Sequence, residues 1–234
     1  EYVHILTMDT VNGYSAVTRK IFGKTLPGYD PLSLLLFLVT APPNVLMPDW
    51  WLEGIATWAE TEFTSSGRGR SSYVEMIFRM AVLEDNIPKV DQINGDVPYW
   101  PSGKMPYIYG MLFEKYIAEI KGRETLSELS VSHSRRLPFL ISAPAERSTG
   151  SHYAKLYSDM VNELKAGHME KIKDLNAQPV TGYNKIPVRG EQVTNPRISP
   201  DGRYLAANRN DPHFHEEIVV LDAETHEELS TIRR

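Results

Sequence analysis

Cysteine is absent from this chain of 234 residues. Its absence excludes disulfide bridges and thiolate metal ligands, so a metal site could use only histidine, aspartate or glutamate. Closed structural zinc sites usually contain cysteine, whereas catalytic sites keep one coordination position open. The absence of cysteine therefore favours a catalytic role over a structural one for any metal that this chain binds.

An excess of basic residues and long hydrophobic runs are also lacking. The chain has 25 Lys and Arg against 30 Asp and Glu, a formal net charge of −5. Because no basic stripe is present, we do not expect nucleic acid as a partner. The longest apolar run, residues 32–41, is too short to span a bilayer and predicts a buried helix or an interfacial segment. We therefore do not expect an integral membrane protein within this chain.

What the sequence does have is the composition of a globular protein and a helical pattern. The hydrophobic share is 41%, and a chain of this length can bury a sizeable core. Apolar residues recur every three and four positions in several segments, which predicts helices. These segments are 1–10, 31–41, 49–63, 71–84, 105–121, 125–135 and 151–175. We therefore predict a mainly α-helical domain over residues 1–175.

The pattern changes after residue 175. Residues 176–185 are typical of a linker, and residues 186–234 predict short strands separated by turns such as Pro200-Asp201-Gly202. One small sheet cannot bury both of its faces, so we expect neighbouring units beyond residue 234. A first residue other than Met and a strand-like last segment predict that the chain is a piece of a longer protein, truncated at both ends.

The first chemical motif is Glu1-Tyr2-Val3-His4. A histidine before Glu1 would complete H-E-x-x-H, in which two histidines four residues apart share one helical face and bind one zinc ion. The alternative is a solvated glutamate and an ordinary histidine, because Glu-x-x-His by itself is common in helices.

The second motif is W-W-L-E-G-I-A-T-W-A-E at residues 50–60. A glutamate among large apolar side chains is costly to bury unpaired, and a metal ion would resolve that cost for Glu53. Gly54 and Ala56 are small enough for another helix to approach closely. The alternative is an amphipathic helix whose Glu53 faces water.

The third motif is Pro106-Tyr107-Ile108-Tyr109-Gly110. The hydroxyl of either tyrosine can donate a hydrogen bond, and the family resemblance given below favours Tyr107 over Tyr109 as the functional residue. The alternative is that both tyrosines only pack on a helix.

In this order the three motifs resemble those of gluzincin metallopeptidases, which have H-E-x-x-H, then W-x-x-E-G-x-A, then P-Y-x-x-G. The resemblance implies a helical catalytic subdomain, a Zn²⁺ cofactor and a peptide or protein substrate. It implies that zinc is held by a histidine before Glu1, by His4 and by Glu53. It also implies that Glu1 is the general base acting on a metal-activated water and that Tyr107 stabilises the oxyanion. The function expected of the intact protein is therefore that of a zinc-dependent peptidase.

Two features depart from the family pattern. The first ligand is missing, so we expect this chain alone to be inactive. His4 and Glu53 are separated by 48 residues, more than in the family, and an insertion over 11–48 could form a lid or hydrophobic flap over the cleft. Asp9 and Glu60 could orient the ligand imidazoles, since Glu60 shares a helix face with Glu53.

Near the C-terminus, I-S-P-D-G-R-Y-L-A at residues 198–206, with the later strand 218–222, resembles the blade repeat of TolB-like β-propellers. This resemblance implies that residues 186–234 begin a propeller, which could bind a protein partner. It also implies a periplasmic, cell-envelope or secreted location in a bacterium. The rival interpretation is a non-catalytic protein in which a peptidase-like domain has lost activity and the propeller acts as a binding module.

Overall fold

The computed structural model describes residues 2–95, 97, 100–136, 140–179, 181–190, 192–211 and 214–233. The chain divides into a helical unit, formed by residues 1–97 and 101–177, and a second unit that contains residues 178–234. Glu1 lies outside the described residues, so the structure does not place the expected general base.

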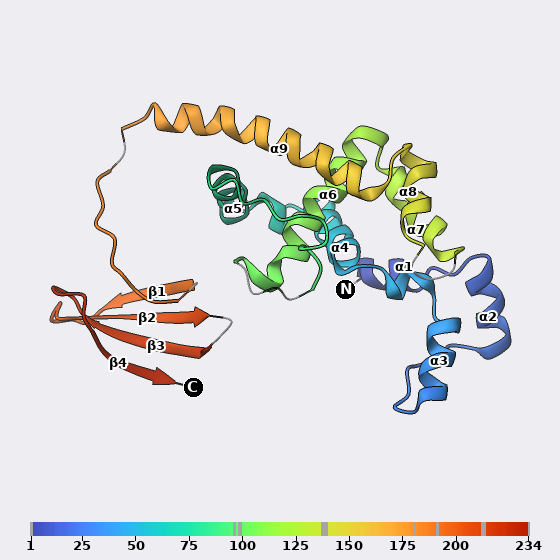
Figure 1. Ribbon diagram of the computed structural model, residues 1–234, viewed down its shortest axis with the longest axis horizontal. Coiled ribbons are helices and arrows are strands. Elements are labelled where there is room, and N and C mark those ends of the chain that lie inside the picture. The colour runs from blue at the N-terminus through green and yellow to red at the C-terminus, as the bar shows by residue number, and fades with distance from the viewer. Residues whose placement is uncertain are drawn as a thin grey trace. The chain divides into compact units, whose positions relative to one another are not determined.

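The helical unit contains nine α-helices within the described residues (Figure 1). They are α1 (Tyr2–Met8), α2 (Tyr14–Phe22), α3 (Pro31–Thr40), α4 (Asp49–Phe63), α5 (Ser72–Leu83), α6 (Met105–Lys121), α7 (Glu124–Ser134), α8 (Ser142–Thr149) and α9 (Tyr153–Asn176). Short 3₁₀ turns lie at Pro43–Leu46 (η1), Arg68–Arg70 (η2) and Ser102–Lys104 (η3). The expected helical domain is thus confirmed, with α4 and α6 at their predicted bounds.

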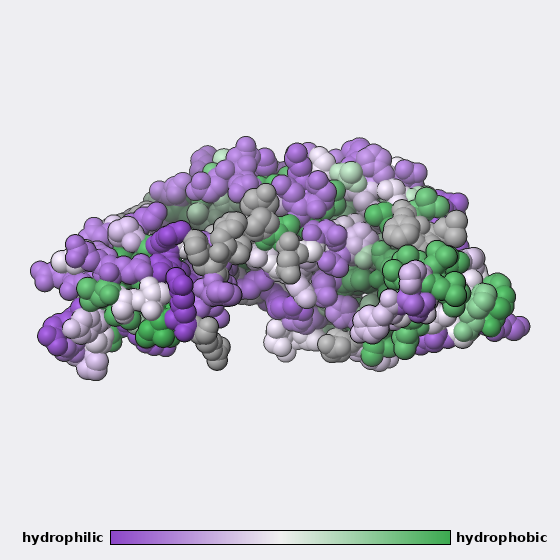
Figure 2. All heavy atoms as spheres, turned by 60° about the horizontal axis from the view of Figure 1, so that its bottom comes forward, coloured by the Kyte–Doolittle hydropathy of each residue, from purple (hydrophilic) through white to green (hydrophobic). Residues whose placement is uncertain are grey.

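Two helices, α2 and α8, were not predicted. The buried side chains of α2 are Ser15 and Thr18, whereas Val17 and Ile21 on the same helix are exposed. This arrangement inverts the usual rule that the apolar stripe of a helix faces the core. In the space-filling view, apolar side chains gather at the end of the helical unit where α2 and α3 lie (Figure 2).

The core of the helical unit is built where α4 crosses α6. Trp50 and Trp51 of α4 contact Tyr153 at the start of α9, and Trp50 also contacts Phe113 of α6. Trp51 and Phe113 are fully buried. Burying such large rings contributes much of the stabilisation of a core, so this crossing fixes the positions of α4 and α6.

The second unit is an antiparallel sheet of order β1-β2-β3-β4, formed by β1 (Gln192–Ile198), β2 (Tyr204–Asp211), β3 (Phe214–Asp222) and β4 (Glu228–Arg233). The predicted turn at 200–202 joins β1 to β2, with Gly202 at a φ of +73° that favours glycine. Ala207, Val219 and Leu221 form the small core on one face. A β segment after the helical domain is thus confirmed, as four strands that do not close into a propeller.

None of the helices in the described part of the chain is long and apolar enough to cross a membrane.

Candidate functional site

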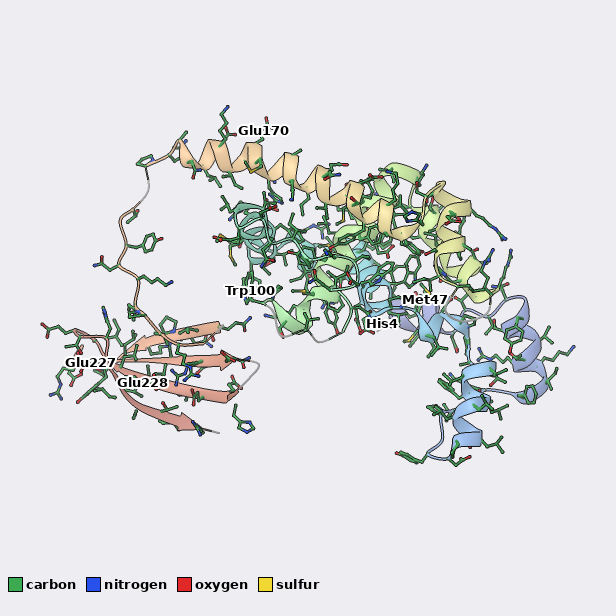
Figure 3. The ribbon with its side chains drawn as sticks, viewed as in Figure 1. His4, Met47, Trp100, Glu170, Glu227 and Glu228 are labelled. Atoms are coloured by element: carbon green, nitrogen blue, oxygen red, sulfur yellow. The ribbon has the colours of Figure 1, made fainter. Side chains whose placement is uncertain are left out.

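His4 and Glu53, the two predicted metal ligands within the described residues, are in contact. His4 on α1 and Glu53 on α4 lie 49 positions apart in the sequence, yet Nε2 of His4 is 3.1 Å from Oε2 of Glu53. Both side chains are partly exposed, at 22% and 28%. Figure 3 shows His4 on α1, which packs against α4. The fold therefore brings together two groups that the sequence only suggested as partners.

The short helix α1 is held in place by Asn44, which lies on η1. The side-chain amide of Asn44 donates hydrogen bonds to the carbonyl oxygen of Thr7, at 2.9 Å, and to that of Ser130, at 3.0 Å. Asn44 is fully buried, so these bonds are shielded from water. Because Thr7 is one turn from His4, Asn44 fixes the helix that presents His4 to Glu53. An isolated asparagine belongs to no motif, so the sequence carries no sign of this role for Asn44.

Tyr107 on α6 lies near Glu53 because α4 and α6 cross at two glycines. A Cβ atom on Gly110 would lie 2.3 Å from the carbonyl oxygen of Trp50, so the two backbones are in direct contact there. Burial raises the pKa of Tyr107, and the negative charge of Glu53 raises this pKa further. The phenol therefore stays protonated at neutral pH and remains a hydrogen-bond donor.

Arg68 on η2 connects Glu60 to Tyr107. The backbone N–H and Nε of Arg68 each donate to the carboxylate of Glu60 at 3.0 Å, and the guanidinium lies 5.0 Å from the centre of the Tyr107 ring. Burial tends to raise the pKa of Glu60, but the hydrogen bonds from Arg68 outweigh it and lower this pKa. Glu60 thus acts on Arg68, and through it on the tyrosine ring, rather than on the imidazole that we expected it to orient.

Asp9, the other carboxylate expected to orient a histidine, also has different partners. It accepts a hydrogen bond from Arg19 at 3.3 Å and pairs with Lys24 at 3.5 Å. Burial raises the pKa of Asp9, but the hydrogen bond and charge of Arg19 together with Lys24 lower it overall. Asp9 thereby ties the end of α1 to the end of α2.

A groove of about 320 Å³ lies beside Tyr107. Its walls include the apolar side chains of Val74, Ile108 and Met111. Two cations line it as well, Arg68 and Lys104, and the Lys104 ammonium lies 5.2 Å from the centre of the Tyr73 ring. The groove is therefore suited to an apolar group with a polar or anionic end.

The donor atoms of His4 and Glu53 fit a zinc ion. Two ligands of one tetrahedral zinc stand roughly 3.4 Å apart, because each bond is about 2.0–2.2 Å long. The observed 3.1 Å needs only a small side-chain rotation to reach that value. Among the residues that the structure describes, no group of three His, Cys, Asp or Glu could hold a metal ion. A third protein ligand would have to come from outside these residues.

Comparison of the chain with protein-family models, with curated proteins and with solved structures finds no match.

Proposed function

We propose that the helical unit belongs to a zinc-dependent peptidase, in which His4 and Glu53 supply two of three protein ligands. The contact between Nε2 of His4 and Oε2 of Glu53 carries the proposal, because two residues chosen from separate motifs meet across 49 positions. A bound zinc ion would polarise a peptide carbonyl and lower the pKa of water. The nitrogen and oxygen donors and the partial exposure of both side chains support this role.

Tyr107 would donate a hydrogen bond to the oxyanion that develops on the substrate carbonyl. Its raised pKa keeps the proton on the phenol, and the guanidinium of Arg68 over its ring restricts the orientation of the side chain. A preoriented donor of this kind stabilises a developing charge better than water does, since it needs no reorganisation. Glu1 would serve as general base by virtue of its place in the motif.

The groove beside Tyr107 supports a peptide as the substrate. A peptide bond held near Tyr107 would place a neighbouring side chain against Ile108 and Met111. Burial of an apolar side chain there would contribute binding energy, and the cations at the groove would favour a carboxylate or carbonyl oxygen. We propose a peptide with an apolar residue next to the cleaved bond.

The sheet of the second unit supports a different candidate function, a binding module. Four antiparallel strands in sequential order are the unit from which propeller blades are built. Tyr204, Ile218 and Ile232 are large apolar side chains of this sheet that remain exposed, at 41%, 41% and 58%. We propose that residues 186–234 form one propeller blade, whose exposed apolar side chains contact further blades or a protein partner.

Zinc affinity distinguishes the two functions. We would measure it by competition with a fluorescent chelator for the wild-type chain, for His4→Gln and for Glu53→Gln. The matched control is Glu170→Gln, at an exposed position on α9. A version with a histidine added before Glu1 should bind zinc at least about tenfold more tightly, because a third ligand adds a coordination bond. Both ligand variants should lose this gain, and the control should keep it.

Peptide hydrolysis by the histidine-extended chain is the second readout. If its Glu1→Gln variant keeps zinc bound but loses turnover, Glu1 has the role of general base. A folded, extended chain whose zinc affinity is unaffected by His4→Gln and Glu53→Gln would refute the metal site. Zinc binding without turnover would leave the binding module as the better function.

A further inference from the structure

The helix α3 exposes apolar side chains over more than half of its circumference, whereas Ser33, Phe37 and Thr40 form a partly buried stripe along the remaining side. Its exposed side chains include Leu32, Leu34, Leu35, Leu36, Leu38 and Val39. Thr40, at its last position, is its only fully buried residue. In Figure 2 the end of the helical unit that carries α2 and α3 shows the largest gathering of apolar surface in that view.

The distribution of these side chains indicates what covers them. Consecutive helical residues point about 100° apart, so Leu34, Leu35 and Leu36 span an arc of about 200°. A groove in a partner protein covers one stripe of a helix, formed by positions three and four residues apart. An exposed apolar arc that is wider than such a stripe instead suits surroundings that are apolar on several sides, as hydrocarbon is.

Several polar groups at the ends of α3 are paired within the chain. Asp30 accepts a hydrogen bond from the N–H of Ser33 at 2.9 Å, and Pro31 has no N–H to satisfy. The hydroxyl of Thr40 donates to the carbonyl oxygen of Leu36 at 2.6 Å. The hydroxyl of Tyr14 donates to the carbonyl oxygen of Val39. Internal pairing of this kind is what a segment needs where water is scarce.

The charged residues beside α3 also support a lipid surface as the partner. The segment 11–41 holds three basic residues, Arg19, Lys20 and Lys24, and one acidic residue, Asp30, within a chain of net charge −5. Arg19 and Lys24 also pair with Asp9, so this group of charges together with Asp9 carries a net charge of +1. The three basic residues lie at the end of α2 and just after it. Lysine and arginine beside an apolar surface are attracted to the phosphates of anionic lipids.

The length of α3 limits how deep it can reach. Ten residues of helix extend about 15 Å, roughly half of the hydrocarbon core of a bilayer. The carboxylate of Asp30 at the N-terminus of α3 also has to remain among the head groups, because a charge in hydrocarbon is costly. A helix of this length can enter one leaflet at its boundary with the head groups and cannot cross the bilayer.

We propose that α2 and α3 form a docking arm that inserts α3 into the interfacial region of a phospholipid bilayer with anionic head groups. The arm is anchored to the helical unit by Ser15, whose hydroxyl donates to the carbonyl oxygen of Ser134 at 2.8 Å. Binding by this arm would hold the helical unit at the membrane surface. The inference does not depend on the metal site.

Flotation with lipid vesicles tests the proposal. The full chain is mixed with vesicles of phosphatidylcholine and phosphatidylglycerol and is compared with the pair variant Leu32→Ser/Leu35→Ser. The control variant, Leu83→Ser/Leu175→Ser, removes two leucines of similar exposure from α5 and α9. All four positions are exposed, so the variants should fold, which circular dichroism and thermal unfolding verify.

We expect the wild-type chain and the control to float with the vesicles. The pair variant should partition at least about tenfold less, because each leucine contributes hydrocarbon transfer free energy. Failure of the wild-type chain to float, or flotation of the pair variant like the wild type, would overturn the proposal. A wild-type dimer in the absence of lipid that the pair variant disperses would also overturn it, since a second copy would then cover α3.

Discussion

Gly54 on α4 and Gly110 on α6 lie so close that a Cβ atom on Gly54 would come within 2.6 Å of the carbonyl carbon of Gly110. Glu53 is the neighbour of Gly54, and Tyr107 is one helical turn before Gly110. The crossing of these two backbones therefore sets the distance between the proposed ligand and the proposed oxyanion donor.

Gly54→Ala should destabilise the helical unit. The added methyl group meets backbone atoms that cannot turn aside, and overpacking of this kind costs about 1–3 kcal/mol. The matched control is Gly167→Ala in α9, where no atom lies within 4 Å of the new Cβ. That control should stabilise the chain by up to about 1 kcal/mol, because alanine favours helix. Urea unfolding measures both, and equal effects at the two sites would contradict the close crossing.

Asn44→Ala should lower the unfolding free energy by roughly 2–4 kcal/mol, because it leaves the buried carbonyl oxygens of Thr7 and Ser130 without their amide donor. It should also weaken zinc binding by the histidine-extended chain, since α1 carries His4. Asn86→Ala, at an exposed position after α5, serves as the control and should change neither quantity. If Asn44→Ala weakens folding while zinc affinity is unchanged, Asn44 does not position His4.

Tyr107→Phe should reduce kcat for peptide hydrolysis by the zinc-loaded, histidine-extended chain by about 100-fold, which is the usual effect of removing one oxyanion donor. Zinc affinity should not change, because the phenol is not a ligand. Tyr73→Phe is the control, as Tyr73 lines the same groove and keeps its ring. A Tyr107→Phe chain with wild-type kcat would remove Tyr107 from the mechanism.

Glu114 and His133 should make stability depend on pH in opposite directions. Glu114 on α6 is fully buried, and within the described residues its carboxyl oxygens have no hydrogen-bond partner. Burial raises the pKa of Glu114 well above 4.5, so the folded chain holds this proton more tightly than the unfolded chain does. The stabilising effect is complete below pH 4.5 and is lost as the pH rises through the folded pKa.

Glu114→Met should therefore raise the unfolding free energy at pH 8 by about 1–3 kcal/mol and remove this loss. Glu119→Met, at an exposed position on the same helix, should do neither. Urea unfolding at several pH values measures both variants. The unfolding free energy of the wild-type chain, relative to that of Glu114→Met, should fall between pH 5 and 8. If it does not fall, Glu114 is not protonated in the folded chain.

His133 has the opposite sign. Burial, aided by the charge of Arg136, lowers the pKa of His133 to about 4. Its Nε2 is 2.8 Å from the hydroxyl of Tyr153. The folded chain thus holds neutral histidine, and the resulting stability is present above pH 6.5 and is lost as the pH falls toward 4. The difference between these pKa values corresponds to roughly 3 kcal/mol. His133→Gln should abolish this acid-side loss in urea unfolding.

The sequence alone determined the helical character of residues 1–175, the bounds of α4 and α6, and the choice of His4, Glu53 and Tyr107. These follow from local features, namely apolar periodicity and short motifs, which neighbouring residues are sufficient to define. It did not predict α2, because the helix buries Ser15 and Thr18 and exposes its apolar side chains. Periodicity indicates where an apolar face is, and only the packing of the chain decides whether that face is covered.

Only the tertiary structure decided which of these residues meet. The contact of His4 with Glu53, the support of α1 by Asn44, and the partnership of Glu60 with Arg68 each join segments that are distant in sequence or lie on different elements. A carboxylate takes the nearest cation or donor that the fold supplies, so the sequence could not predict that Asp9 and Glu60 pair with arginines. The sequence determined which chemical groups are present, whereas the packing of α1, α4 and α6 determined which groups they contact.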